Sequence, residues 1–294
     1  MLATFEPYRV AARPKRARHR CGSPGDGQAT SVRAGYRVGV IGPDNELTVP
    51  QRRALRLEVT IVLTVTFGLS AVTAILQLVD SALRNLGAQT VALNPERSYF
   101  DLIDLGLNLA AVAQLIAWGA LGVYLLWRSG FDPVRIGLGR FRWRSDLLGG
   151  LGLAAVIGVP GLALYVAARA LGMNVSVVPS ALDDTWWRIP VLIAAAFANG
   201  WAEEVIVVAY LLTRLQQLRV HPVTALICSS LLRGAYHLYQ GFGAGLGNIA
   251  MGLVFGYVWR RTGRLWPLVI AHGVIDTVAF VGYALLAGHL GWLR

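Results

Sequence analysis

Seven apolar segments, separated by short polar stretches, dominate the pattern of the chain. Each is close to the roughly 20 residues that a helix needs to cross the hydrocarbon core of a bilayer. They fall at about Val59–Val79, Leu105–Trp127, Leu147–Ala168, Ile189–Leu215, Val223–Tyr239, Phe242–Trp259 and Leu265–Leu286. The pattern predicts an all-α, polytopic membrane helix bundle of about seven transmembrane helices.

The same pattern divides the chain into three parts. Residues 1–50 lack periodicity and include the basic run Arg13-Pro-Lys-Arg-Ala-Arg-His-Arg20, which predicts a disordered basic tail. No apolar region follows that run, so we do not expect a signal peptide. Residues 51–188 hold three apolar segments that look like scaffold, and residues 189–294 hold the other four, with all the unusual polar residues.

Composition supports a membrane protein, because 55% of the 294 residues are hydrophobic. The net charge of +11 does not require nucleic acid, since residues 1–56 alone carry eleven Arg and Lys against four Asp and Glu. We expect no nucleic-acid partner and favour contact of the tail with anionic membrane lipid. Cys21 and Cys228 give neither a disulfide framework nor a metal-binding spacing.

Charges in the connecting loops predict the orientation. Every second loop is basic, and cytoplasmic loops carry an excess of Arg and Lys. The basic loops and their edges hold Arg128, Arg135, Arg140, Arg142, Arg144, Arg214, Arg219, Arg260, Arg261 and Arg264. We therefore expect an integral protein, of a bacterial plasma membrane, with its N-terminus in the cytoplasm and its C-terminus outside.

Glu203 and Glu204 are the only charges between Ile189 and Thr213. Ionisable side chains at that depth cost a few kcal/mol, so by default they mark a functional site. Other polar residues of the last four segments are candidates to face them. These are Arg233, which we expect to be the only cation inside these segments, His237, His272, Asp276 and, from the sixth segment, Asn248.

Helical spacing brings some of these candidates together. Arg233 and His237 are four residues apart, as are His272 and Asp276, so each pair shares a helix face. Counted at 1.5 Å per residue, Glu203 and His237 lie roughly 22 and 21 Å from their cytoplasmic helix ends. The same count places His272 at roughly 10 Å, a few turns nearer the cytoplasm, a mismatch that unequal helix ends or helix tilt would close.

These residue types are able to activate water. A carboxylate and an imidazole in one cavity can take a proton from it, and a second histidine beside a carboxylate can stabilise an oxyanion. Glu203, His237 and His272 also match a catalytic zinc set, so the cofactor is either absent or zinc. Structural alternatives remain open: a buried ion pair of the glutamates with Arg233, an interfacial His237, and a helix-packing pair of His272 with Asp276.

Three motifs resemble those of the CAAX protease and bacteriocin-processing (CPBP, or Abi) family of intramembrane peptidases, E-E-x-x-x-R, F-x-x-x-H and H-x-x-x-N/D. Here they read Glu203-Glu204-Val-Ile-Val-Val208, Arg233-Gly-Ala-Tyr-His237 and His272-Gly-Val-Ile-Asp276, within residues 189–286. The resemblance implies a helical membrane hydrolase. It also implies that Glu203, with Glu204 beside it, and His237 activate water while His272 and Asp276 help to hold the oxyanion.

Two positions depart from that pattern. Val208 stands where the family has arginine, and Arg233 stands where it has phenylalanine. Two buried glutamates without a cation would be costly. We therefore hypothesise that the cation paired with the glutamates has moved from their own helix to the next one.

The leading prediction is a membrane peptidase, glutamate-type or zinc-dependent, that cleaves a peptide or a membrane-anchored protein in or near the bilayer. One alternative is an inactive scaffold or immunity protein of the same fold, which the missing arginine at Val208 favours. Another is a proton-coupled transporter, since carboxylates and histidines also form proton relays. Against the transporter, the two halves of the chain show no repeat.

Overall fold

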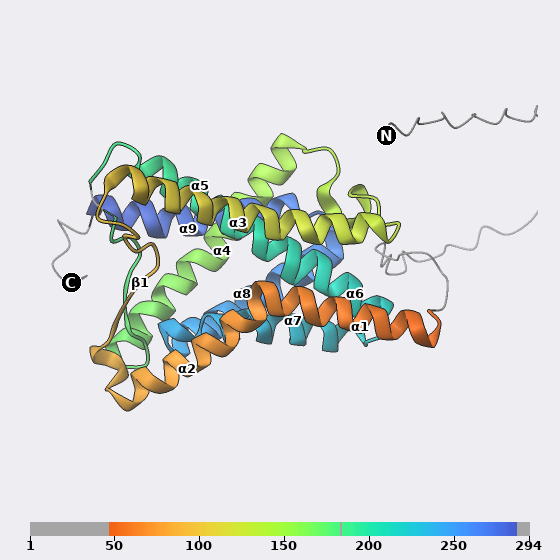
Figure 1. Ribbon diagram of the computed structural model, residues 1–294, viewed down its shortest axis with the longest axis horizontal. Helices are drawn as coiled ribbons and strands as arrows, with labels where there is room; N and C mark the ends of the chain where they lie inside the picture. Colours follow the sequence, from red (N-terminus) through yellow and green to blue (C-terminus); the bar gives the residue numbers. More distant parts are fainter. Residues whose placement is uncertain (1–46, 183, 287–294) are drawn as a thin grey trace, which may run out of the picture. The chain divides into compact units, whose positions relative to one another are not determined.

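The structure is a computed structural model that describes residues 47–182 and 184–286, and it is mostly helical (Figure 1). The predicted tail lies outside the described residues except at its end, where helix α1 begins. The helices and their bounds are α1 (Val49–Leu63), α2 (Leu69–Leu83), α3 (Asp101–Arg128), α4 (Trp143–Ala170), α5 (Arg188–Glu203), α6 (Leu211–Gln217), α7 (Pro222–Tyr236), α8 (Phe242–Thr262) and α9 (Trp266–Leu286). Shorter elements are the turns η1 (Thr64–Gly68), η2 (Leu86–Ala88), η3 (Val134–Leu138), η4 (Glu204–Tyr210) and η5 (Leu238–Gln240), and the paired parallel strands β1 (Thr90–Ala92) and β2 (Ser176–Val178).

Some of these elements join into longer rods. Within the described residues, five rods are long and apolar enough to cross a membrane, and they indicate an integral membrane protein. They are Val49–Leu83, Asp101–Arg128, Trp143–Ala170, Arg188–Gln217 and Phe242–Thr262. Helix α7 has only 15 residues, or about 22 Å, which is less than the hydrocarbon thickness. The count of seven spans and their orientation therefore stay predictions.

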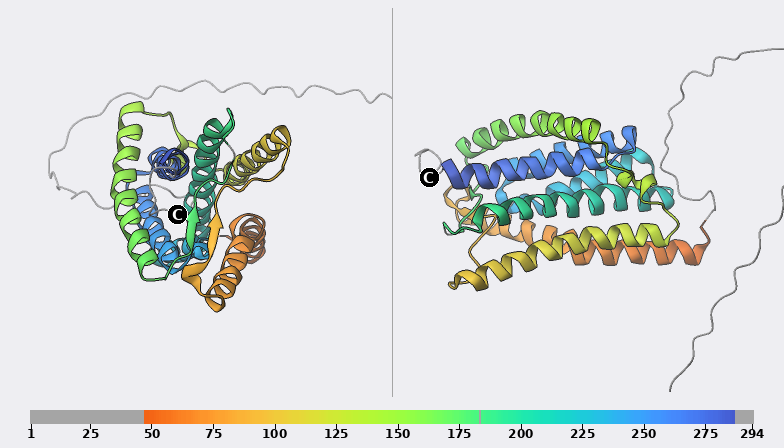
Figure 2. Two further views of the ribbon diagram at one scale, coloured as in Figure 1. Left: turned by 90° about the vertical axis from the view of Figure 1, so that its left-hand side faces the viewer. Right: turned by 90° about the horizontal axis from the view of Figure 1, so that it is seen from above.

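Helix α5 lies between α3 and α9, while α4 packs on α9 and α7 packs on α8 (Figure 2). This arrangement surrounds the fourth rod, whose residues are all buried from Ala202 to Arg214. Two hydrophobic clusters meet there, one containing Val208 and Phe255 and the other containing Ile206. The two glutamates consequently lie in the interior of the bundle and not on its lipid-facing surface.

Glycines allow the helices around the glutamates to approach closely. A Cβ added at Gly200 of α5 would lie 3.1 Å from the Cβ of His272 on α9. A Cβ added at Gly273 would lie 2.5 Å from the ring of Phe197. Small residues at helix crossings in membranes permit this close packing. The α5–α9 crossing therefore brings His272 directly against the rod that carries the glutamates.

Arg214 was expected among the basic residues at a helix end, but it is 1% exposed. Its Nη2 atom lies 2.7 Å from Oε1 of Glu58, and the hydroxyl of Tyr210 donates to the same oxygen at 2.9 Å. The guanidinium also donates to the carbonyl oxygen of Leu125 and to the side chains of Ser129 and Gln217. We call Glu58, Tyr210 and Arg214 the Glu58 cluster. Arg214 lies in the last turn of α6, at the helix end where the sequence places it, and Glu58 at the edge of the first segment supplies a partner for it there.

Arg264 is also paired within the bundle although the sequence places it in a basic loop. It donates to the buried carboxylate of Asp146 at the start of α4, and these hydrogen bonds raise the pKa of the guanidinium. The next residue, Leu265, is fully buried, and its amide donates to the carbonyl oxygen of Gly137 at 3.0 Å. Helix α9 thus begins inside the bundle and not at its surface.

Candidate active site

Glu203 and Glu204 lie where α5 gives way to the π-helical segment η4, and they are 2% and 0% exposed. Such π-helical segments are rare and frequently occur at functional sites. Successive side chains on a helix point about 100° apart, so the two carboxylates face different neighbours. Their partners come from α7 and α9.

Two side chains, a guanidinium and an imidazole, bind the carboxylate of Glu204. Its Oε1 atom lies 2.7 Å from Nη2 of Arg233 and 2.7 Å from Nδ1 of His272. Arg233 is 0% exposed, so this ion pair is fully buried. Glu204 therefore ties α7 and α9 to its own rod, and its charge is balanced by the guanidinium.

Glu203 has a different environment. Its Oε2 atom accepts a hydrogen bond of 2.6 Å from the hydroxyl of Tyr236. Nη1 of Arg233 lies 3.8 Å from that oxygen, which is beyond hydrogen-bonding distance. The two adjacent carboxylates are thus not equivalent, since a neutral phenol holds one and a guanidinium holds the other.

His237 follows the last residue of α7 and is half-buried. Its Nδ1 atom lies 2.9 Å from the backbone carbonyl oxygen of Arg233. A carbonyl oxygen only accepts, so Nδ1 carries the proton, and in the neutral ring Nε2 keeps a lone pair. The imidazole lies beside the ring of Tyr236, with centroids 4.8 Å apart.

His272 and Asp276 lie on α9 beside these groups. Nε2 of His272 is 3.6 Å from Oδ2 of Asp276, and Nδ2 of Asn199 donates to that oxygen at 3.0 Å. Asn199 is four residues before Glu203 on α5, hence on the same helix face. We call this set the Glu203 cluster, and its members are Asn199, Glu203, Glu204, Arg233, Tyr236, His237, His272 and Asp276.

His272 lies beside Glu204, so the mismatch in depth that came from counting the helical rise is not present in the structure. Counting the helical rise assumed that all helices begin in one plane. Helix α9 begins deeper, because Leu265 before it is buried and bonded to Gly137. The offset of this helix end accounts for the difference.

Asn248, the remaining candidate, donates from Nδ2 to the carbonyl oxygen of Ala244 on its own helix at 3.1 Å. Within residues 47–182 and 184–286, no hydrogen bond joins Asn248 to the Glu203 cluster. Nor does this part of the chain place three or more His, Cys, Asp or Glu side chains so that they could hold a metal ion. The placement of Glu203, His237 and His272 therefore does not fit a zinc site.

Two members of the cluster, Tyr236 and Asn199, were not singled out from the sequence. A tyrosine in an apolar helix is common, so Tyr236 gave no signal beyond its place next to His237. Asn199 gave a weak signal, since it lies one helical turn before Glu203. Their roles depend on contacts with other helices or with a carboxylate that sequence spacing alone does not reveal.

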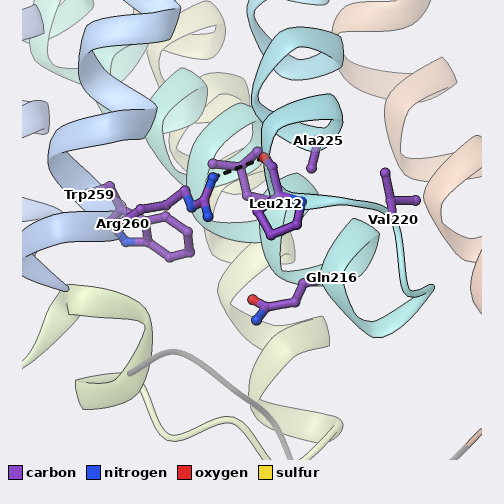
Figure 3. A pocket seen from close by; sticks show the side chains of 7 residues that line it. Leu212, Gln216, Val220, Ala225, Trp259 and Arg260 are labelled. Atoms are coloured by element: carbon purple, nitrogen blue, oxygen red, sulfur yellow. Dashed lines mark hydrogen bonds between the residues drawn. The ribbon is translucent and has the colours of Figure 1, made fainter. Parts of the chain in front are cut away.

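A small hollow between α6, α7 and α8 is lined by residues that are not members of this cluster (Figure 3). Its lining is mainly apolar, with Arg260 donating to the carbonyl oxygen of Pro222 at 2.9 Å along one side. The lining residues are Leu212, Gln216, Val220, Pro222, Ala225, Trp259 and Arg260. None of them is a candidate catalytic residue, so this hollow adds nothing to the site.

Residues 185–278 match the family model described as Type II CAAX prenyl endopeptidase Rce1-like. The matched range covers α5 to most of α9 and includes every member of the Glu203 cluster. The first three rods lie outside it. No curated protein and no solved structure was found to match the chain.

Proposed function

We propose, from the premise that residues 185–278 are a domain of the Rce1-like family of CAAX prenyl endopeptidases, that this chain is an active intramembrane peptidase. The family consists of proteases, and the candidate spans indicate a membrane protein. The substrate class that follows is a peptide or a membrane-anchored protein. The bond cleaved lies in or near the bilayer, and the same membrane lipid surrounds enzyme and substrate.

The observation that carries this proposal is the difference between the two adjacent carboxylates. Glu204 is neutralised by Arg233, whereas Glu203 is held only by the hydroxyl of Tyr236 on one oxygen. Oε1 of Glu203 accepts no hydrogen bond from the described residues. A carboxylate with one hydrogen-bonded oxygen and one oxygen without a hydrogen bond is able to accept a proton from water at the second oxygen.

In the proposed reaction, Glu203 removes a proton from a water molecule that His237 orients through Nε2. The hydroxide oxygen attacks the peptide carbonyl carbon, and the carbonyl π electrons move to its oxygen. His272, held by Glu204 and adjacent to Asp276, stabilises the developing oxyanion. The proton taken by Glu203 then passes to the leaving nitrogen as the C–N bond breaks.

The test is cleavage of a pool of membrane-anchored peptides by the purified protein in lipid, followed by mass spectrometry. We expect wild type to cleave, and Glu203→Gln and His237→Ala each to lower kcat about 10³-fold, since each removes a group that acts on the proton. Parallel reactions with a chelator establish whether a metal takes part. Cleavage that survives Glu203→Gln would contradict the assignment of the base.

A catalytically inactive scaffold is the second candidate, and the departure at Val208 favours it. The family motif has a cation on the same helix as the glutamates, whereas here that position is a buried valine. A scaffold would cleave no peptide and would keep its cellular function in the Glu203→Gln variant. The peptidase would lose that function with the same substitution.

A further inference from the structure

We propose that Tyr236 is a positioning residue that orients Glu203, and that Phe67 of the first rod fixes Tyr236. This inference rests on the proposed function. It adds Tyr236, which lies within the second motif, to the site, and it gives a supporting role to the first rod, which lies outside residues 185–278. The residues concerned lie on α5, α7 and η1.

The first step is the contact with the carboxylate. The hydroxyl of Tyr236 is 2.6 Å from Oε2 of Glu203, and the two residues are 6% and 2% exposed. Hydrogen bonds from a neutral hydroxyl to a carboxylate are short and about twice as strong as neutral ones. In a buried setting this bond restricts rotation of the carboxylate and leaves Oε1 as the oxygen open to another group.

The second step is that no other group takes this role. Nη1 of Arg233 is 3.8 Å away, and its Nη2 is bonded to Glu204. Among the described residues, Tyr236 is therefore the single hydrogen-bond donor to the side-chain carboxylate of Glu203. Without the hydroxyl, the carboxylate is free to turn toward the guanidinium and away from His237.

The third step is the support of the tyrosine ring. Phe67 stacks on it, with centroids 4.8 Å apart and an interplanar angle of 28°. Trp118 of α3 in turn meets Phe67 edge to face at 5.5 Å. Phe67 lies in the π-helical turn η1 and is 4% exposed. Phe67, with Trp118 behind it, therefore supports the Tyr236 ring from rods that the matched range does not include.

The test is Tyr236→Phe, which keeps the stacked ring and removes only the hydroxyl. We expect kcat to fall about 10²-fold, the loss typical of a misplaced catalytic group, with KM unchanged and the unfolding temperature lowered, because a buried carboxylate loses its hydrogen-bond donor. Tyr210→Phe is the matched control, since it removes a hydroxyl that donates to Glu58 outside the site, and its kcat should equal that of wild type. A kcat of Tyr236→Phe within twofold of wild type would overturn the proposal.

A second readout does not need a substrate. In protein labelled with ¹³C at the glutamate carboxyl carbons, the infrared difference between wild type and Glu203→Gln isolates the Glu203 band. We expect this band to shift in Tyr236→Phe and not in Tyr210→Phe. An unshifted band would show that the hydrogen bond is absent and would refute the inference. Because this arm works without cleavage, failure of the peptidase proposal remains distinguishable from failure of this one.

If Tyr236→Phe does not fold, Phe67→Leu provides the alternative variant. It leaves the hydroxyl in place and removes the aromatic support of the ring. We expect a smaller loss of kcat, about threefold to tenfold, with a broadened Glu203 band and unchanged KM. Wild-type kcat together with an unbroadened band would show that the first rod does not fix Tyr236.

Discussion

The Glu203 cluster and the Glu58 cluster contain the same kinds of side chain but differ in how they are satisfied. In each, a glutamate accepts a hydrogen bond from a tyrosine hydroxyl, at 2.6 Å in the first and 2.9 Å in the second. In each, a buried arginine pairs with a glutamate at 2.7 Å. The residue types alone therefore do not distinguish a reactive cluster from a structural one.

The two clusters differ in the ratio of carboxylates to arginines and in the number of buried polar atoms that lack a hydrogen-bond partner. The terminal nitrogens of Arg214 donate to Glu58, to Gln217 and to Leu125 and Ser129 at the end of α3, and the Glu58 side chain is 29% exposed. Arg233 faces two carboxylates, and among the described residues its Nε and Nη1, and Oε2 of Glu204, have no hydrogen-bond partner. A buried polar group without a partner requires an explanation such as a functional role. In the Glu58 cluster the described residues leave one such atom, Nε of Arg214, so the Glu203 cluster is the less fully satisfied of the two.

The largest expected effect comes from Arg233→Leu, which leaves Glu203 and Glu204 buried without their cation. Removing one partner of a buried ion pair costs about 3–5 kcal/mol, so we expect the free energy of unfolding to fall by about that amount. The measurement is the free energy of unfolding in mixed micelles. A loss below about 1 kcal/mol would show that the glutamates do not need this cation.

Adding Val208→Arg to Arg233→Leu tests whether the cation has changed helices. Val208 and Phe255 belong to one buried cluster, and the guanidinium of Arg233 lies 5.8 Å from the Phe255 ring. An arginine at position 208 therefore enters the space beside the glutamates. We expect the double variant to recover part of the lost stability, while Val208→Arg alone destabilises the wild type by adding a second buried cation. No recovery would refute the exchange of positions.

Arg214→Leu is the corresponding change in the Glu58 cluster, and we expect a smaller loss of about 1–3 kcal/mol. Glu58 is partly exposed, so water can replace the lost partner. Cleavage per folded molecule should stay at the wild-type value, because among the described residues no hydrogen bond or ion pair joins Arg214 or Glu58 to the Glu203 cluster. A fall in kcat without loss of folded protein would show that the two clusters are coupled.

Much of the helical arrangement could be predicted from the sequence because long apolar runs are a strong signal. Glu203 and Glu204 stood out for the same reason, as charges in an apolar segment. The Glu58 cluster gave no such signal, since Glu58 lies next to basic residues at a segment edge and Arg214 is 156 residues later. Phe67 and Tyr236 were hidden too, because aromatic residues are ordinary in membrane helices and their stacking joins η1 to α7, which are far apart in the sequence.

Glu58→Gln should have the smallest effect. The amide oxygen of glutamine still accepts from Tyr210 and Arg214, so only the charge is lost, and a partly exposed ion pair contributes about 1 kcal/mol or less. Glu204→Gln is the matched change at a fully buried carboxylate, where Arg233 and His272 both depend on the negative charge. We expect its loss of unfolding free energy to be clearly larger, and its kcat to fall because His272 loses its anchor. Equal losses in the two variants would mean that burial does not separate the clusters, and the distinction between a structural and a reactive glutamate would then rest on His237 and His272 alone.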